Sequence, residues 1–335
     1  MKNGIGSRIT AVLVASALSA SLWGQTPSTK PPVDTEQLWF TDLSLCQSTA
    51  HRKDPALLPR IREMLQSPTQ RYGNSAHSMT VCALVALGRI GTEEALAVLE
   101  SVAGTLKPYY RESYVPVIRA RLRADMEFPA VHTREQWEQK VAFFLQEAEL
   151  AREALQEALK NHPQFGDPMV YPSRGVVAVR VLLEMAEAAY ANGVKEALGF
   201  FQGLALEQDD PSRVRYQLIP LNQRQRIEWL IHSLTHKPAR RFRDRYELLA
   251  LWRCGEAAIP AILAKIEELS SQKPKEEAEV VRVNVGIANL LEVLAGFDDP
   301  RVEPTLERFV RENFKAEEFL RRHRKGLRGV VIMDW

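Results

Sequence analysis

The residues with the clearest chemical potential form an arginine-rich block at positions 212–254. The block holds 10 basic and 3 acidic side chains, a net charge of +7, with aromatic residues between them. The planar guanidinium fork suits carboxylates and phosphates, and Arg, Trp and Tyr contribute most of the energy at protein interfaces. We therefore predict a binding surface for an acidic protein or peptide. Its candidate residues are Arg224, Arg226, Trp229, His232, His236, Arg240, Arg241 and Arg243.

A second interpretation of the same charges stays open. The preceding segment, residues 131–211, holds 7 basic and 13 acidic side chains, a net charge of −6. The acidic and basic segments could neutralise each other inside the chain, because ion pairs between neighbouring elements are a common and weakly stabilising pattern. The sequence does not decide between a binding surface and internal pairing.

The nearest approach to a metal site lies within the same block. Glu228, His232 and His236 follow one another at steps of four, which places them on one face of a helix. Glu228 and His236 are two turns apart, about 12 Å at the helical rise, so the three side chains cannot bind one ion. A site made of the two histidines and a ligand from elsewhere is the remaining alternative. We expect no metal and no cofactor.

Motifs of the common enzyme classes are absent from the sequence. Residues 25–335 contain no phosphate-binding GxxxxGK loop, no GxSxG nucleophile elbow, no HExxH zinc motif and no GxGxxG dinucleotide motif. We therefore predict a non-catalytic protein. The alternative is an accessory factor or enzyme that acts on an anionic small molecule through residues 212–254.

The elements that must hold these residues follow a repeated pattern. Residues 84–99 read LVALGRIGTEEALAVL: an apolar helix end, a break at Gly88 and Gly91, and a second apolar helix. Residues 291–306 (LEVLAGFDDPRVEPTL) repeat that layout, and residues 249–262 (LALWRCGEAAIPAI) fit it with a shorter loop. Pairs of helices of this kind bury their apolar faces by stacking on neighbouring pairs.

These three units resemble HEAT repeats, particularly those of bilin-lyase-type proteins. The resemblance covers residues 78–103, 243–270 and 284–311, and Pro260 and Pro304 correspond at a spacing of 44 residues, within the usual period. It implies an all-α, right-handed α-solenoid of HEAT-like helical hairpins, whose concave groove binds proteins or peptides. The bilin-lyase branch implies tetrapyrrole binding as an alternative for the arginine-rich block.

Helical periodicity, without an alternating strand pattern, continues between the repeats. Thr133 and Gln136 form a capping box, and nearly thirty residues follow without Gly or Pro. This predicts one long helix to about Asn161 that braces the repeats. We expect N-terminal HEAT-like repeats at 35–130, the long helix and divergent helical pairs at 131–211, C-terminal HEAT-like repeats at 212–325 and a tail at 326–335.

The first 24 residues have the composition of a secretory signal peptide. Lys2 and Arg8 precede a short apolar stretch at 9–18, and small residues offer cleavage near Gly24. Removal of this segment leaves 42 of the 44 basic side chains against 42 acidic ones, and a neutral protein has no general attraction for nucleic acid. We expect a disordered leader at 25–34 and a secreted or periplasmic protein without stable membrane insertion.

Three cysteines, Cys46, Cys82 and Cys254, are too few for a disulfide framework. We expect buried, apolar thiols, with a Cys46–Cys82 bridge as the alternative. The sequence identifies neither the partner nor the oligomeric state.

Overall fold

The computed structural model describes residues 35–52, 54–161, 172–204, 206, 211–236, 246–311 and 315–330. Within these ranges every regular element is a helix and no strand occurs, so the all-α prediction is confirmed. The α-helices are α1 (Thr35–Arg52), α2 (Leu58–Gln66), α3 (Pro68–Tyr72), α4 (Ala76–Ile90), α5 (Glu93–Ala103), α6 (Pro108–Ser113), α7 (Val115–Glu127), α8 (Arg134–Glu147), α9 (Arg152–Lys160), α10 (Arg174–Ala191), α11 (Pro211–Leu218), α12 (Gln223–His236), α13 (Tyr246–Arg253), α14 (Ile259–Ser271), α15 (Glu277–Ala295), α16 (Val302–Phe309) and α17 (Ala316–Arg324).

Four short 3-10 helices complete the described elements: η1 (Pro55–Leu57), η2 (Gly73–Ser75), η3 (Lys195–Phe201) and η4 (Gly255–Ala258). None of the described helices is long and apolar enough to cross a membrane.

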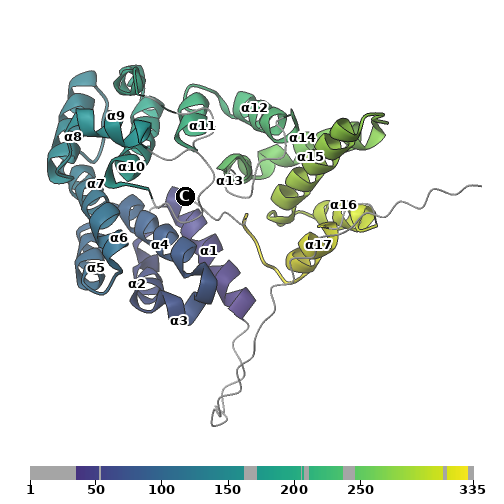
Figure 1. Ribbon diagram of the computed structural model, residues 1–335, viewed down its shortest axis with the longest axis horizontal. Helices are drawn as coiled ribbons and strands as arrows, with labels where there is room; N and C mark the ends of the chain where they lie inside the picture. Colours follow the sequence, from purple (N-terminus) through teal and green to yellow (C-terminus); the bar gives the residue numbers. More distant parts are fainter. Residues whose placement is uncertain are drawn as a thin grey trace, which may run out of the picture. The chain divides into compact units, whose positions relative to one another are not determined.

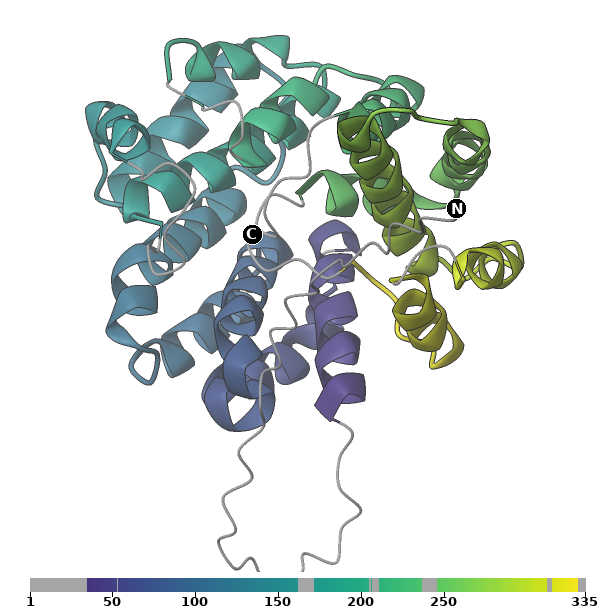
Figure 2. The ribbon, with the colours of Figure 1, turned by 45° about the vertical axis from the view of Figure 1, so that its right-hand side comes forward.

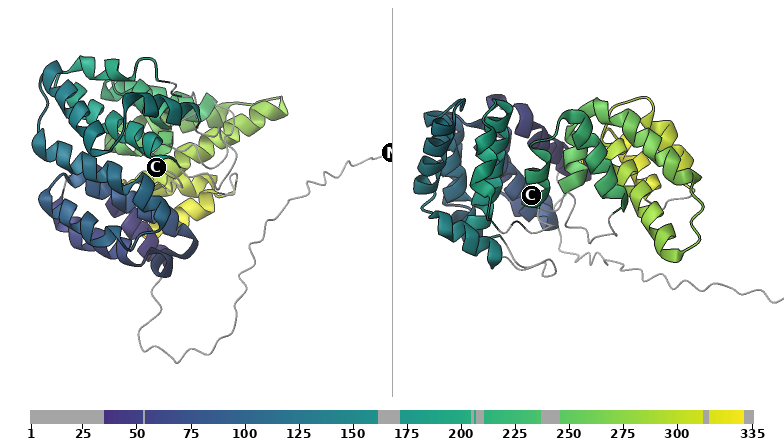
Figure 3. Two further views of the ribbon diagram at one scale, coloured as in Figure 1. Left: turned by 60° about the vertical axis from the view of Figure 1, so that its left-hand side comes forward. Right: turned by 90° about the horizontal axis from the view of Figure 1, so that it is seen from above.

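One set of helices forms a continuous path of contacts from the start to the end of the described chain. Helices α1, α4, α7, α10, α11, α13, α15 and α17 each pack against the next (Figure 1). A second set packs alongside this path: α2 on α4, α8 on α7, α9 on α10, and α14 on α15. Figure 3 shows the helices from two further sides. Most side chains of α4 and α10 are buried, because each of these helices has neighbours on several sides.

The three repeated units of the sequence correspond to pairs of helices: α4 and α5, α13 and α14 with η4 between them, and α15 and α16. Pro260 and Pro304 both stand in the first turn of the second helix, where the missing N–H leaves no helical hydrogen bond unmade. Gly88 does not break the first helix, contrary to the prediction. Helix α4 runs on to Ile90 and ends at Gly91, whose φ of 68° is left-handed.

Glycine at positions 88 and 296 allows close contact between helices. A Cβ atom on Gly88 would lie 3.1 Å from Cδ of Arg121 on α7. A Cβ atom on Gly296 would lie 2.9 Å from the indole of Trp252, whose Nε1 donates a hydrogen bond to the Gly296 carbonyl oxygen at 3.1 Å. Both glycines therefore serve packing between helices, and Gly296 is also the C-cap residue of α15.

The predicted long helix is wrong. The capping box of Thr133 and Gln136 is present, but α8 ends at Glu147 and α9 starts at Arg152. Glu149 adopts a left-handed φ of 53°, and the N–H of Leu150 donates to the carbonyl of Leu145 at 3.0 Å, which closes the helix in a Schellman motif. Glycine usually takes this position, so the sequence carries no signal for the break.

Several other sequence expectations lie outside the described residues. These are the signal peptide and leader at 1–34 and residues 331–335 of the predicted tail. The three cysteines are free thiols. A hydrogen bond with Cys82, together with burial, raises the pKa of the Cys46 thiol well above its usual value, so Cys46 is a protonated, apolar side chain.

The described helices enclose two apolar cores. The first is formed by α1 to α10 and includes Leu84, Phe144 and Leu182. The second is formed by α11 to α17 and includes Leu249 and Leu294. Helix α10 packs against α11, so the two cores adjoin in the middle of the sequence. They adjoin again where α17 meets α1.

The α1–α17 junction is held by polar contacts. Both carboxylate oxygens of Glu36 bind the guanidinium of Arg321, at 2.5 and 2.6 Å, and one also binds Lys325 at 3.1 Å. The amide of Gln47 donates to the carbonyl oxygen of Val330 at 2.7 Å. Arg322 lies 4.3 Å from the centre of the Phe40 ring. Figure 2 shows α17, in yellow, beside α1, in purple.

Replacement of Glu36 tests this junction. Hydrogen bonds from Arg321, opposed by partial burial and supported by Lys325, lower the pKa of Glu36 to about 2. A lowered pKa in the folded state contributes stability above the unfolded value and loses it as pH falls towards the folded one. We expect Glu36→Gln to lower the free energy of unfolding by about 1 kcal/mol at pH 7 and by almost nothing at pH 2.

The measurement is urea unfolding of both proteins at the two pH values. Glu138→Gln is the matched control, because Glu138 pairs only with Arg134 on its own exposed helix face. A loss that stays the same at pH 2, or that the control reproduces, would contradict the role of the Glu36 ion pairs.

Candidate functional site

A buried carboxylate with three arginine partners lies where the two apolar cores adjoin. Glu184 on α10 binds Arg89 of α4, Arg121 of α7 and Arg215 of α11. We call these four residues the arginine hub. Nε of Arg89 is 2.9 Å and Nη1 of Arg215 is 2.6 Å from the carboxylate. All four side chains are less than 10% exposed. One carboxylate therefore ties together three elements of the first core and the first helix of the second.

The hub carboxylate stays ionised. Burial alone would raise the pKa of Glu184, but the charges of Arg89, Arg215 and Arg121 outweigh it and hold the pKa well below its usual value. A buried carboxylate with this many donors stabilises a fold only as long as each partner remains, because the loss of one leaves uncompensated charge. The hub is extended by Asp125, which lies 3.5 Å from Arg121 and 2.6 Å from Lys140.

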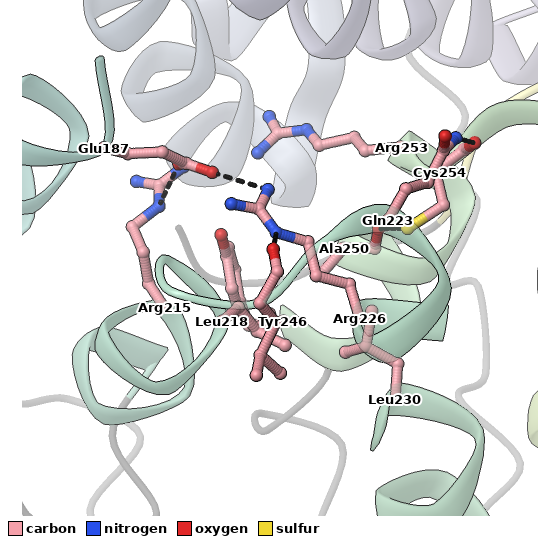
Figure 4. Close-up of a pocket in the computed structure, with 11 residues that line it drawn as sticks. Glu187, Arg215, Leu218, Gln223, Arg226, Leu230, Tyr246, Ala250, Arg253 and Cys254 are labelled. Carbon is pink, nitrogen blue, oxygen red and sulfur yellow. Dashed lines mark hydrogen bonds and ion pairs between the residues drawn. The ribbon is translucent and has the colours of Figure 1, made fainter. Parts of the chain in front are cut away.

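A pocket of about 330 Å³ lies next to the hub, between α10, α11, α12 and α13. Figure 4 shows its lining. Charged side chains come from Glu187, Arg215, Arg226 and Arg253, and the apolar part comes from Leu218, Leu221, Leu230 and Ala250. The guanidinium of Arg215 lies 5.3 Å from the centre of the Tyr246 ring, which completes the wall. The volume of the pocket falls at the lower end of the range for small-molecule sites.

Two of the pocket arginines are engaged in the fold. Arg226 donates to Glu187 at 2.9 Å and to the carbonyl oxygens of Leu221 and Ile219 at 2.9 and 3.1 Å. Arg215 belongs to the hub, and its Nε is also 3.7 Å from Glu187. The fixed positions of these two guanidinium groups make the cationic end of the pocket rigid.

The third pocket arginine, Arg253, differs from the other two. It has no hydrogen bond and no ion pair with any residue in the described ranges, and its Nε is enclosed without a partner. Burial and the nearby charges of Arg89 and Arg215 lower the pKa of Arg253 to about 10. Arg253 is therefore still protonated at neutral pH, but in surroundings that disfavour its charge.

The described hub and pocket carry excess positive charge. Five guanidinium groups, those of Arg89, Arg121, Arg215, Arg226 and Arg253, face two carboxylates, those of Glu184 and Glu187. Lys140 and Asp125 add one positive and one negative group, so the excess of positive groups stays at three. The two glutamates of α10 thus neutralise part of the basic block, as the internal-pairing interpretation predicts, but not all of it.

The structure divides the predicted site residues. Arg224, His232 and His236 lie on the exposed face of α12, where Arg224 pairs with Glu228 at 2.8 Å. Trp229 is half-buried against the second core. Of the predicted set, Arg226 alone is among the residues that line the pocket, and three of the predicted arginines lie outside the described residues: Arg240, Arg241 and Arg243.

Among the described residues, the exposed histidines have no third side chain with which they could hold a metal ion. The rings of His232 and His236 stack with 4.0 Å between their centres, and Nδ1 of His236 donates to the His232 carbonyl oxygen at 3.1 Å. Partial burial and the neighbouring His236 and Lys265 lower the pKa of His232. Across the described ranges, no three His, Cys, Asp or Glu side chains are grouped so that they could hold an ion.

Sequence reasoning missed the central residues of the site. Glu184 stands in the apolar run VVAVRVLLEMAEAA, where a carboxylate has to be buried, and that is a usable signal for a partnered charge. Arg253 and Tyr246 lie inside the arginine-rich block at 212–254, but they belong to no recognisable sequence motif. Arg89 and Arg121 are distant in sequence and have no signal that connects them with Glu184.

Comparisons with known proteins identify no relative. No protein-family model matches the chain, and neither a curated protein nor a solved structure is significantly similar to it.

Replacement of Glu184 tests the hub. Glu184→Gln removes the negative charge and leaves three buried guanidinium groups facing one another, so we expect a loss of about 3–5 kcal/mol in the free energy of unfolding at pH 7. Urea unfolding measures this loss. Glu100→Gln, which breaks the exposed pair with Arg119 (2.6 Å), is the control and is expected to cost less than about 1 kcal/mol. Similar losses in both variants would contradict a central role for Glu184.

Proposed function

We propose that this protein is a non-catalytic helical scaffold that binds an acidic protein or peptide through the α10–α13 pocket. The observation that carries the proposal is Arg253, a partly buried guanidinium in the pocket wall with no hydrogen bond or ion pair among the described residues. An unpaired charge in such surroundings destabilises the protein by itself, and a bound anion relieves that cost. Three excess positive charges in hub and pocket favour an anionic ligand in the same way.

The proposal also includes how the helices are arranged. HEAT-like helical hairpins stacked into a right-handed α-solenoid would explain the corresponding helices at residues 78–103, 243–270 and 284–311. Such stacks serve many binding proteins, so the architecture supports a scaffold without naming its partner. A secreted or periplasmic location follows from the sequence of residues 1–24.

A free anionic small molecule is the second candidate. The pocket volume of about 330 Å³ favours it, because that volume suits one small ligand or the end of a larger one. The two candidate ligands differ in whether they cover the exposed residues around the pocket. A protein partner covers the exposed residues at the pocket mouth, whereas a small molecule leaves them uncovered.

Site-specific crosslinking in the native host tests the proposal. A photoreactive amino acid at Gln223, an exposed residue of the pocket lining, is expected to capture a protein partner. The same amino acid at Gln217, exposed on α11 but absent from the pocket lining, is the matched position and is expected to capture none.

Charge reversal then links capture to the pocket. Arg253→Glu is expected to abolish the crosslink at Gln223, whereas Arg224→Glu, on the exposed face of α12, is expected to preserve it. Circular dichroism confirms that both variants are folded. Absence of a protein adduct, or an adduct that survives Arg253→Glu, would contradict the proposed function.

A further inference from the structure

The pocket has two chemically different ends. In Figure 4 the charged groups of Glu187, Arg215, Arg226 and Arg253 lie towards one end, which we call the charged end, and Leu218 and Leu230 lie towards the other, the apolar end. Leu221 and Ala250 also line the pocket. Leu218, Leu230 and Ala250 are themselves more than 90% buried, so the apolar end is a fixed part of the second core. A ligand that fills both ends must carry an anionic group directly beside an apolar one.

One guanidinium at the charged end, that of Arg253, has no partner among the described residues. The nitrogen atoms of Arg226 are used by Glu187 and by two backbone carbonyls, and Arg215 is held by Glu184. Arg253 has no such bonds within the described chain. A guanidinium fork takes up one carboxylate through two parallel hydrogen bonds. In Figure 4 the guanidinium groups of Arg226 and Arg253 both point towards the Glu187 end of the pocket.

Glu187 restricts the anion further. Its carboxylate lines the same end of the pocket, so a second negative charge on the ligand would be repelled. This favours a monoanionic carboxylate over a phosphate dianion. A carboxylate has about four acceptor positions, and Glu187 uses one in a hydrogen bond to Arg226 and lies 3.7 Å from Arg215. Glu187 therefore has acceptor capacity left for an N–H group of the ligand.

We propose that the pocket binds the C-terminal carboxylate of a peptide whose last residue is apolar, with Arg253 as the anchor of the carboxylate. The last side chain fills the apolar end between α11, α12 and α13. The N–H of the last residue donates to Glu187. This inference rests on the proposed function and specifies which part of the partner enters the pocket.

Direct binding to short synthetic peptides tests the inference. Isothermal titration of the protein uses N-acetylated tripeptides Ala-Ala-X in which X is Leu, Phe, Lys or Asp, each with a free or an amidated C-terminus. We expect the free Leu and Phe peptides to bind and amidation to weaken them at least tenfold. We expect X = Lys and X = Asp to bind at least tenfold more weakly, because neither side chain suits an apolar pocket.

Two further ligands distinguish a peptide C-terminus from a free organic acid and from phosphate. Free 4-methylpentanoate carries the carboxylate and the apolar group but no N–H for Glu187, and inorganic phosphate carries charge alone. We expect both to bind at least tenfold more weakly than the Leu peptide. Equal binding of 4-methylpentanoate would assign the pocket to free organic acids, and tighter binding of phosphate would assign it to phosphate groups. Either result would overturn the proposal.

Variants connect binding to Arg253. Arg253→Met is expected to remove the difference between free and amidated peptides, and Arg253→Lys to retain part of it, because lysine keeps the charge without the fork. Arg224→Met is the matched control and is expected to bind within twofold of the unmodified protein. Unchanged discrimination in Arg253→Met would overturn the proposal.

Thermal stability supplies a second readout that a structural role would not reproduce. Without ligand, Arg253→Met is expected to melt a few degrees above the unmodified protein, because an unpaired charge is removed. The Leu peptide is expected to raise the melting temperature of the unmodified protein but not that of the variant. A variant that melts lower and binds peptide normally would show that Arg253 is structural.

Failure of this inference is distinguishable from failure of the proposed function. If amidated and free peptides bind equally while a protein is still crosslinked at Gln223 in an Arg253-dependent manner, only the C-terminal specificity is wrong. If free C-termini bind through Arg253 but no protein is captured, the chemistry of the pocket stands and the protein partner does not.

Discussion

The described structure depends on one buried interaction, the carboxylate of Glu184 with the guanidinium groups of Arg89, Arg121 and Arg215. It lies where helices of the first apolar core meet the first helix of the second. Apolar contact alone is not directional, whereas a carboxylate with three charged donors fixes the positions of four helices. The cost is desolvation of four charges, which only a complete set of partners repays.

The pocket follows from the same interaction. Because Arg215 is held by Glu184, and Arg226 by Glu187 and two carbonyl groups, the glutamates of α10 fix two sides of the pocket. Neither glutamate of α10 forms an ion pair with Arg253, which remains unpaired among the described residues. The α1–α17 junction joins the same two cores at the other end of the chain, through Glu36. Two ionic junctions therefore connect the cores, and the one at α10 borders the pocket.

Local chemistry made much of the helical structure predictable. The capping box at Thr133 and the left-handed helix end at Gly91 both stand where residue type alone places them. The break at Glu149 was not predictable, because a glutamate there adopts a conformation that usually belongs to glycine. Gly88 looked like a helix end, but it provides room for Arg121.

The site was predictable as a region and not as a set of residues. The basic block contains Arg215, Arg226 and Arg253, which line the pocket. A pattern of steps of four favours one helix face, however, and on α12 that face is the exposed one, with Arg224 and His232. The pocket draws its residues from four helices, so its composition depends on tertiary packing that no spacing encodes.

The central claim is that Glu184 and Arg215 couple the two cores directly. A double-mutant cycle measures this coupling, with urea unfolding of Glu184→Gln, Arg215→Gln and the double variant against the unmodified protein. The structure predicts a coupling energy of about 2–3 kcal/mol, because the two groups share a buried hydrogen bond of 2.6 Å. Effects that add to within about 0.5 kcal/mol would contradict the claim.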